Sequence, residues 1–257
     1  TGRSYDEILA ETDALGYLEA DPALDLDGID AAHKLAILSS VAFGTKTDFD
    51  NVYIEGIRNI KTIDIEYGKE LGYRIKLLAI TNYQEGKLSQ RVHPAMIDRK
   101  LPIAGVMDGF NAIVVDGDFI DRTFYQGRGA GEGPTASAVV ADLIDIARGH
   151  IGPAFFKPAS KLIEAVPTSI NARKGAYYIR LHVKDEAGVI ADITTALKQA
   201  SVSVETMLQK GTEQDGTVYV VMTTHDTTET ALKDALNRIN ELTSVIETPL
   251  SIRIEKL

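Results

Sequence analysis

The sequence predicts an α/β (α+β) protein with two domains of different design. Its 257 residues are enough for two hydrophobic cores, and a content of 44% hydrophobic and 25% charged residues is ordinary for a globular chain. Two apolar helical segments precede a β-rich region, whereas residues 176–257 show strand and helix patterns in the order βαββαβ. We therefore expect a mainly β sheet covered by helices, followed by a ferredoxin-like unit.

The first helices are indicated by caps and by apolar periodicity. In SYDEILAETDALGY, Ser4 and Glu7 have the capping-box spacing and Gly16 follows the last turn. The more apolar segment IDAAHKLAILSSVAFG predicts a second helix that ends at Gly44. From Val52 onward apolar residues recur at every second position, which is typical of strands. We expect strand, helical turn, strand, turn and strand in NIKTIDIEYGKELGYRIKLLAITNYQEGKLSQRVHPAMI.

A hairpin and a glycine-rich loop complete the first domain, residues 1–152. Asp116-Gly117 lies between two apolar runs, which is a strong hairpin signal. The loop in GRGAGEGPTASAVVADLIDIARGHIG opens a helix, with Pro134 expected at its first position. The polar, proline-containing residues 153–175 are interpreted as a linker.

The second domain, residues 176–257, alternates regularly. AYYIRLHVKDE predicts a strand and GVIADITTALKQAS an amphipathic helix. SVETMLQKG and GTVYVVMTTHD predict two strands about a turn at Asp215-Gly216. A helix capped by Thr227 or Thr228 and a final strand in VIETPLSIRIEKL close the unit.

Composition excludes several classes of partner. A net charge of −10 argues against a nucleic-acid surface, which needs clustered Lys and Arg. No apolar run approaches the length of a membrane span, and no signal-peptide pattern is present. The chain has no cysteine, which fits a cytoplasmic location, and its five histidines lack the spacing of a helical metal site, so we expect no metal.

The acidic stretch GYLEADPALDLDGIDAAHKLAIL allows two interpretations. In the first, it is a solvated helix start, where Asp27 and Asp30 cap free amides and Asp30 pairs with Lys34 one turn later. In the second, Glu19, Asp25 and Asp30 converge on a cleft and hold an ammonium group, while Lys34 faces a reacting oxygen. The apolar neighbours of Lys34 would then desolvate its side chain.

The same stretch carries a family resemblance. Glu19, Asp30 and Lys34 have the spacing of the substrate-site signature of homoserine dehydrogenases, and RVHPAMI and the loop GRGAGEGPTASAV follow in the order of that family. The resemblance covers residue 16 to about residue 145. It implies an NAD- or NADP-dependent enzyme that interconverts L-homoserine and L-aspartate 4-semialdehyde in the biosynthesis of threonine, methionine and isoleucine.

The resemblance also implies roles for single residues. Lys34 would be the acid–base residue, and Asp30 would complete the catalytic pair. Glu19 and Asp25 would bind the amino-acid end of the substrate, with Tyr17 closing the pocket. The residues that would approach the nicotinamide are Gly129, Ala130, Gly131, Pro134 and Thr135.

The glycine loop is not interpreted as a nucleotide-binding fold of its own. Gly131-x-Gly133-x-x-Ala136 matches a dinucleotide fingerprint, yet no βαβ unit surrounds it. The resemblance instead places the cofactor domain ahead of residue 1, and the chain begins without Met. We therefore expect residues 1–257 to need that domain for activity, with any monovalent-cation site in or near it.

The second domain has its own signature. The stretch VKDEAGVIADITTAL resembles the first loop of ACT domains, although Gly188 alone would be explained by a tight strand-to-helix turn. The resemblance implies that Asp185, Ala187, Gly188 and Val189 bind an amino-acid effector, for this family L-threonine. It also implies a homodimer or homotetramer, with the linker coupling the effector to the substrate.

A rival interpretation makes the chain a non-catalytic amino-acid sensor and oligomerisation module. The Glu19, Asp30 and Lys34 set opposes it. His93 and Pro94 are expected at a strand end, in a structural role. Arg122, Arg128 and Arg173 are expected to be surface charges.

Overall fold

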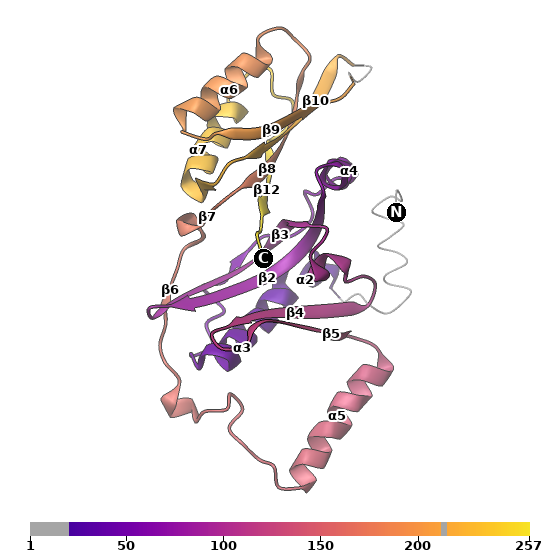
Figure 1. Cartoon of the computed structure of the whole chain (residues 1–257), viewed down its shortest axis with the longest axis vertical. Helices are drawn as coiled ribbons and strands as arrows, with labels where there is room; N and C mark the ends of the chain where they lie inside the picture. The colour runs from indigo at the N-terminus through magenta and orange to yellow at the C-terminus, as the bar shows by residue number, and fades with distance from the viewer. Residues whose placement is uncertain (1–20, 212–214) are drawn as a thin grey trace.

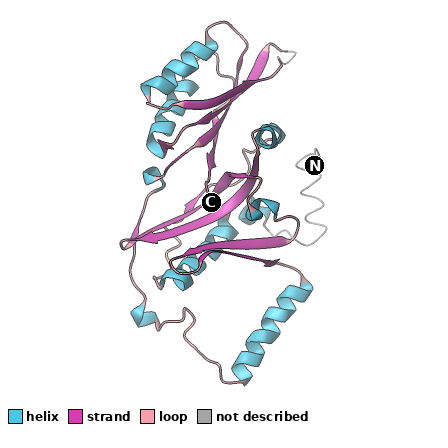
Figure 2. Ribbon diagram, viewed as in Figure 1, coloured by secondary structure: helices cyan, strands magenta, loops and turns pink. Residues whose placement is uncertain are grey.

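The computed structural model describes residues 21–211 and 215–257. The helix expected in SYDEILAETDALGY lies outside these residues. Figures 1 and 2 show the ferredoxin-like unit at one end of an elongated molecule, and the long hairpin of β2 (Tyr73–Gln84) and β3 (Lys87–Asp98) in the middle. Helix α5 (Glu132–Ala147) projects at the other end. We call residues up to 152 the N-terminal domain and residues 176–257 the C-terminal domain.

The N-terminal domain is built on one long hairpin. Strands β2 (Tyr73–Gln84) and β3 (Lys87–Asp98) pair antiparallel along their whole length. Glu85 and Gly86 both have positive φ, at 50° and 78°, as a two-residue type I′ turn requires. The other elements of this domain are α2 (Pro22–Leu26), α3 (Ile29–Phe43), β1 (Tyr53–Ile54), α4 (Thr62–Glu70), a 3₁₀ turn (Pro102–Gly105), β4 (Phe110–Gly117), β5 (Asp121–Arg128) and α5 (Glu132–Ala147).

Helix α4 replaces a strand that the sequence predicts. The alternation in NIKTIDIEY indicates a strand, but Ile63 and Tyr67 also have the i, i+4 spacing of a helix and both pack into one apolar cluster, while Ile65 is exposed. The Asp64 carboxylate accepts a hydrogen bond from the Lys61 backbone N–H at 2.8 Å, which stabilises the first turn. The apolar residues of this segment fit both the strand repeat and the helix repeat, and tertiary packing decides in favour of the helix.

The C-terminal domain has the predicted βαββαβ order. Its elements are β8 (Tyr177–Lys184), α6 (Val189–Gln199), β9 (Val204–Gln209), β10 (Thr217–Thr224), α7 (Glu229–Asn240) and β12 (Leu250–Ile254). The strand order β12-β8-β10-β9 is that of a ferredoxin-like sheet, and α6 and α7 cover one face. Thr228 caps α7 by accepting a hydrogen bond from the Ala231 N–H.

The two domains share one sheet of eight strands. One edge of β3 pairs in succession with three short parallel strands: β6 (Val166–Pro167), β1 and the end of β12. β12 pairs with β8 as well, so it belongs to both domains. The segment 153–175 also contains two 3₁₀ turns (Ala159–Lys161 and Ile170–Ala172) and β7 (Lys174–Gly175), which pairs with β11 (Thr227–Thr228). Residues 163–175 of the segment are therefore anchored to the rest of the protein, and the direct sheet connection is a shorter route between the domains than the linker.

His93 and Pro94 lie inside β3 and not at its end. The β3 carbonyls of Leu88, Val92 and Met96 accept hydrogen bonds along the shared edge. Pro94, which has no N–H, therefore occupies the position between β1 and β12 where no strand pairs, and a ring nitrogen of His93 lies 2.9 Å from its carbonyl oxygen. Proline does not end the strand because this position needs no donor.

An apolar cluster joins the domains across the second face of the C-terminal sheet. Helix α4 supplies Tyr67, and β8, β10 and β12 supply Tyr178, Val221 and Ile252, all buried. Within this cluster Asp64 of α4 lies 2.6 Å from Arg180 of β8, and the Tyr178 hydroxyl donates to Asp64 at 2.9 Å. The ferredoxin-like sheet is thus covered on both faces.

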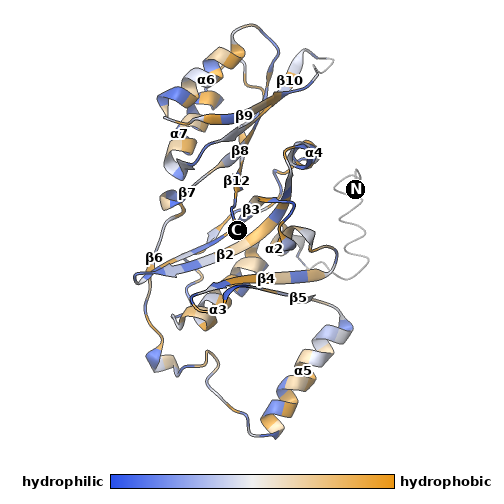
Figure 3. Cartoon of the chain, in the orientation of Figure 1, coloured by the Kyte–Doolittle hydropathy of each residue, from blue (hydrophilic) through white to orange (hydrophobic). Residues whose placement is uncertain are grey.

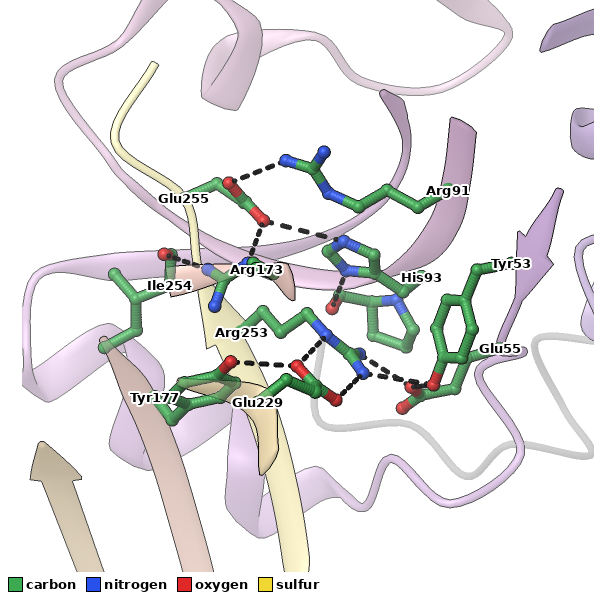
Figure 4. Close-up of polar contacts among 11 residues, drawn as sticks. Tyr53, Glu55, Arg91, His93, Arg173, Tyr177, Glu229, Arg253, Ile254 and Glu255 are labelled. Atoms are coloured by element: carbon green, nitrogen blue, oxygen red, sulfur yellow. Dashed lines mark hydrogen bonds and ion pairs between the residues drawn. The ribbon is translucent and has the colours of Figure 1, made fainter. Parts of the chain in front are cut away.

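A second cluster of charged side chains lies where β12 meets β3 (Figure 4). Arg173 is not a surface residue: its guanidinium lies 3.0 Å from Glu255 and donates to the Ile254 carbonyl, and its side chain is buried. Arg91 also pairs with Glu255, at 3.4 Å. Burial, reinforced by the nearby arginines, lowers the pKa of His93 from 6.5 to about 3, although Glu255 lies 3.5 Å away. His93 is therefore neutral.

The far end of the N-terminal domain carries exposed apolar side chains. Helix α5 has no buried residue, and Figure 3 shows apolar positions along it and along β4. Asp116-Gly117 ends β4 in the predicted hairpin, and Arg122 pairs with Asp116 at the surface, as expected. Arg128 is also exposed and lies over the Phe110 ring. No helix among the described residues is both long and apolar enough to cross a membrane.

Gly56→Ala should destabilise the protein by about 1–3 kcal/mol, because a Cβ there would lie 2.3 Å from the Leu26 carbonyl oxygen and 2.6 Å from Asp27 Cα, which are backbone atoms. Gly105→Ala, where a Cβ meets nothing within 4 Å, should change the free energy of unfolding by less than about 0.5 kcal/mol. Urea denaturation measures both, and equal values would contradict the close approach.

His93 should make stability depend on pH. The unfolded chain binds a proton at this residue as the pH falls through 6.5, whereas the folded chain does not bind it until about 3, so stability is lost on acidification in that window. Between about pH 7 and pH 5, the wild type should lose up to about 1.4 kcal/mol per pH unit more than His93→Gln. Urea denaturation at both pH values tests this, with the exposed His225→Gln as the control expected to match the wild type. Parallel curves for His93→Gln and wild type would refute it.

Candidate functional site

The acidic segment forms a tight turn where α2 meets α3. We call residues 25–30 the acidic turn. Asp21 caps α2 by accepting a hydrogen bond from the Ala23 N–H at 3.0 Å, and Asp25 lies in the same helix, partly exposed. Gly28 joins the helices with φ 79°, and a Cβ there would lie 3.1 Å from Val92 of β3. The turn is therefore pressed against the sheet. Tyr17 and Glu19 lie outside the described residues.

Asp27 does not cap α3, contrary to the expectation for a helix start. Its carboxylate binds the guanidinium of Arg58 through two contacts, of 2.5 and 3.1 Å, and the hydrogen bonding lowers the pKa of Asp27. The N-cap of α3 is Gly28, which has no side chain to accept a hydrogen bond. The charge of Asp27 is thus used to attach the turn to the segment after β1.

Asp30 and Lys34 form the predicted i, i+4 ion pair on α3, at 2.5 Å. The Lys34 side chain is 74% exposed, so the expected desolvation by apolar neighbours is wrong. The helix places Leu35 in the core, whereas Ile37 and Leu38 share the outward face with Lys34 and are themselves exposed. The solvent exposure of a helical side chain depends on the face of the helix that it occupies, and not on the residues next to it in the sequence.

This outward face of α3 has the groups that an acid–base site needs. Asp30 holds the Lys34 ammonium, and the acidic turn begins directly before it. The opposite face, with Ala32, Leu35 and Ala36, packs mainly against β2 and β3 and fixes the helix. A polar substrate bound there would find a proton donor beside carboxylates, with Ile37 and Leu38 for its methylene groups.

The glycine loop lies at the start of α5. A Cβ on Gly129 would overlap the Asn111 side chain at 1.5 Å, and Gly131 has φ 114°, so neither position accepts another residue without change. The helix begins at Glu132, so Pro134 is its third residue and not its first. Proline is tolerated there because the first N–H groups of a helix have no intrahelical partner. Ala130 and Thr135 lie in the same exposed loop and first turn.

The uncapped start of α5 fits a ligand with polar acceptors. No side chain caps its free N–H groups, and the close approach of Gly129 to Asn111 keeps the loop compact. The nicotinamide contact that the resemblance implies at this loop stays a prediction. No group of three His, Cys, Asp or Glu side chains in residues 21–211 and 215–257 is arranged for a metal ion.

The loop before α6 is the candidate effector site. Gly188 is the N-cap of α6 with φ 97°, and a Cβ there would meet nothing within 4 Å, so the glycine serves the backbone conformation and leaves open space. Asp185 and Ala187 are exposed beside it. The Val189 side chain instead packs in the core, so only its backbone faces the loop.

Sequence reasoning missed the buried charges at the domain junction. Arg253 and Glu229 are both almost fully buried and pair with each other at 2.5 Å. The pattern LSIRI reads as an ordinary strand with one outward arginine, because sequence does not show that β12 has neighbours on both edges. Continuous burial over Ile252, Arg253 and Ile254 appears only in three dimensions.

Comparisons with known proteins identify the families to which the two domains are similar. The homoserine dehydrogenase family model matches residues 1–144, and the ACT domain model matches residues 177–243. Homoserine dehydrogenases of Pseudomonas aeruginosa and Neisseria gonorrhoeae are each 41% identical over 100% of this chain, which covers 61% and 60% of those relatives. The chain thus spans about 60% of their length.

Solved structures agree as well. A homoserine dehydrogenase from Thiobacillus denitrificans superposes with a TM-score of 0.89 at 42% identity, covering 99% of this chain and 59% of that chain. The S. aureus homoserine dehydrogenase at pH 7.0 gives a TM-score of 0.69 at 28% identity, covering 99% and 60%. This chain belongs to the homoserine dehydrogenase family and carries an ACT domain at its C-terminal end.

Proposed function

We propose that this chain is the substrate-binding and regulatory part of a cytoplasmic, NAD- or NADP-dependent homoserine dehydrogenase. It would interconvert L-homoserine and L-aspartate 4-semialdehyde in the biosynthesis of threonine, methionine and isoleucine. The observation that carries this proposal is the Asp30–Lys34 ion pair on the outward face of α3, directly after the acidic turn. A lysine held by a carboxylate suits proton exchange with a hydroxyl or aldehyde oxygen.

In this mechanism Lys34 handles the proton and the acidic turn binds the amino acid. Lys34 donates its proton to the aldehyde oxygen during reduction and takes the hydroxyl proton during oxidation. Asp30 keeps the ammonium in place, while Asp25, with Glu19 and Tyr17, binds the substrate's amino-acid end. Bound NAD(P) supplies or accepts the hydride at substrate C4.

The surface around α5 supports the position of the cofactor. Gly129, Ala130, Gly131, Pro134 and Thr135 would contact the nicotinamide, because the loop is exposed and its helix amides are uncapped. The apolar residues along α5, among them Val139, Leu143 and Ile146, are exposed in this chain and suit packing against the cofactor domain.

The ACT domain supports regulation by an amino acid, L-threonine in this proposal. The open space at Gly188 and the exposed Asp185 offer room and a carboxylate for an ammonium group, with Ala187 and the Val189 backbone beside them. β9 ends the shared sheet, which leaves an edge for pairing in a homodimer or homotetramer.

Lys34→Ala should lower kcat for homoserine oxidation by about 100-fold or more, because it removes the acid–base group, while KM changes little. The assay uses the enzyme with its cofactor domain. Lys46→Ala is the matched control, since Lys46 is also an exposed lysine paired with a carboxylate, at 2.5 Å from Glu164. Near wild-type turnover of Lys34→Ala would remove Lys34 from this role.

Gly188→Asp should weaken L-threonine binding by about tenfold or more in calorimetry, because an acidic side chain would fill the open space and strain the backbone at φ 97°. Gly86→Asp is the matched control: Gly86 also has positive φ and open space but lies in the β2–β3 turn. Equal threonine affinity for both variants would place the effector elsewhere.

A further inference from the structure

The shared edge of β3 brings the ACT domain to the substrate site by a short route. β1 and the end of β12 pair with the same edge, at Val92 and at Ala95 respectively, so they lie end to end. We infer that Arg253 of β12 is a positioning residue, which sets the place of the acidic turn, and hence substrate affinity, from the ACT domain. This inference rests on the proposed function and deepens it.

The first half of the connection lies inside the ACT domain. The Arg253 guanidinium donates to both carboxylate oxygens of Glu229 of α7, at 2.5 and 3.1 Å, and the Tyr177 hydroxyl donates to the same carboxylate at 2.8 Å (Figure 4). The Arg253 side chain is 6% exposed and that of Glu229 is 3% exposed. Water therefore cannot replace either partner easily.

The second half crosses the domain boundary. The same guanidinium donates to Glu55 at 2.7 Å and to the Tyr53 hydroxyl at 3.0 Å, and that hydroxyl donates to Glu55 at 2.8 Å. Burial disfavours the charge of Arg253, but Glu229 and Glu55 outweigh this, and the pKa of Arg253 is raised. One cation thus holds a carboxylate from each domain.

The residues after Glu55 are fastened directly to the acidic turn. Gly56 allows the backbone to touch Leu26 and Asp27, where a Cβ would not fit. The Ile57 N–H donates to the Leu26 carbonyl at 2.8 Å, and Arg58 forms its two contacts with Asp27. A shift of Glu55 must therefore move the turn between Asp25 and Asp30.

Such a shift should move Lys34 less than it moves the acidic turn. Helix α3 is held by its own apolar cluster, in which Ala32, Leu35 and Ala36 pack mainly against β2 and β3. A disturbance of the Arg253 contacts should thus weaken substrate binding more than it slows proton transfer. A merely structural role predicts the opposite pattern, because loss of folded enzyme lowers the apparent kcat and leaves KM unchanged.

The test measures KM and kcat for homoserine in the enzyme with its cofactor domain. Glu55→Gln keeps the shape and the Arg253–Glu229 pair but removes the charge that crosses the boundary. We expect KM to rise roughly fivefold or more, with kcat per folded enzyme changing less than about twofold. Arg253→Lys, which keeps the charge but loses the two-pronged contact, should raise KM in the same direction.

Glu247→Gln is the matched control. Glu247 also pairs across the domains, at 2.5 Å from Lys61, with an exposed fraction of 38% against 33% for Glu55. Its ion-pair partners, Lys61 and His182, belong neither to β1 nor to the acidic turn. It should leave KM unchanged. If Glu55→Gln fails to fold, Tyr53→Phe removes one hydroxyl from the same contact and should raise KM by a smaller factor.

The outcomes separate this inference from the proposed function. A wild-type enzyme that does not oxidise homoserine refutes the function. An active wild type whose KM is unaffected by Glu55→Gln and Arg253→Lys, with only the melting temperature lowered, overturns the positioning role alone. A KM that rises equally in Glu247→Gln also overturns it, because any domain contact would then have the same effect.

Discussion

The pairing of β12 with both β8 and β3 is the constraint on which this structure depends. A strand of five residues completes the ACT sheet with one half and joins the N-terminal domain with the other. Arg253, the one charged residue of β12, is buried at this junction, so its guanidinium must find partners inside the protein. Arg253 pairs with Glu229, and Glu255, the residue directly after β12, pairs with Arg173.

The domain junction combines an apolar cluster with charges that are nearly all paired. Tyr67 and Tyr178 exclude water, and Asp64 and Arg180 pair within the same layer. Such a buried pair adds little net stability compared with apolar residues of the same size, but breaking it leaves an uncompensated charge. The interface therefore favours one relative position of the two domains over all others.

The candidate catalytic face contrasts with this junction. Lys34 and Asp30 are open to solvent, and their positions depend on a helix that is held from its other side. An exposed ion pair contributes little to stability, so the fold does not depend on the pairing of Asp30 with Lys34. The acidic turn beside it is held by the Asp27–Arg58 contact and by Gly56.

The sequence by itself determined the order of elements in the ACT domain, helix α3 with its end at Gly44, and the β4–β5 hairpin. It also contains the motifs around Lys34 and Gly131. These features can be predicted because they depend on local periodicity, turn residues and the spacing of residues along the chain. It did not determine that residues 62–67 are helical, that Lys34 is exposed, or that the side chains of Arg173 and Arg253 are buried. Those features depend on which surfaces meet, and the contacts that decide them join residues 24 to 200 positions apart. Only the tertiary structure brings such residues together, so only it could place Arg253 of β12 beside Tyr53 and Glu55.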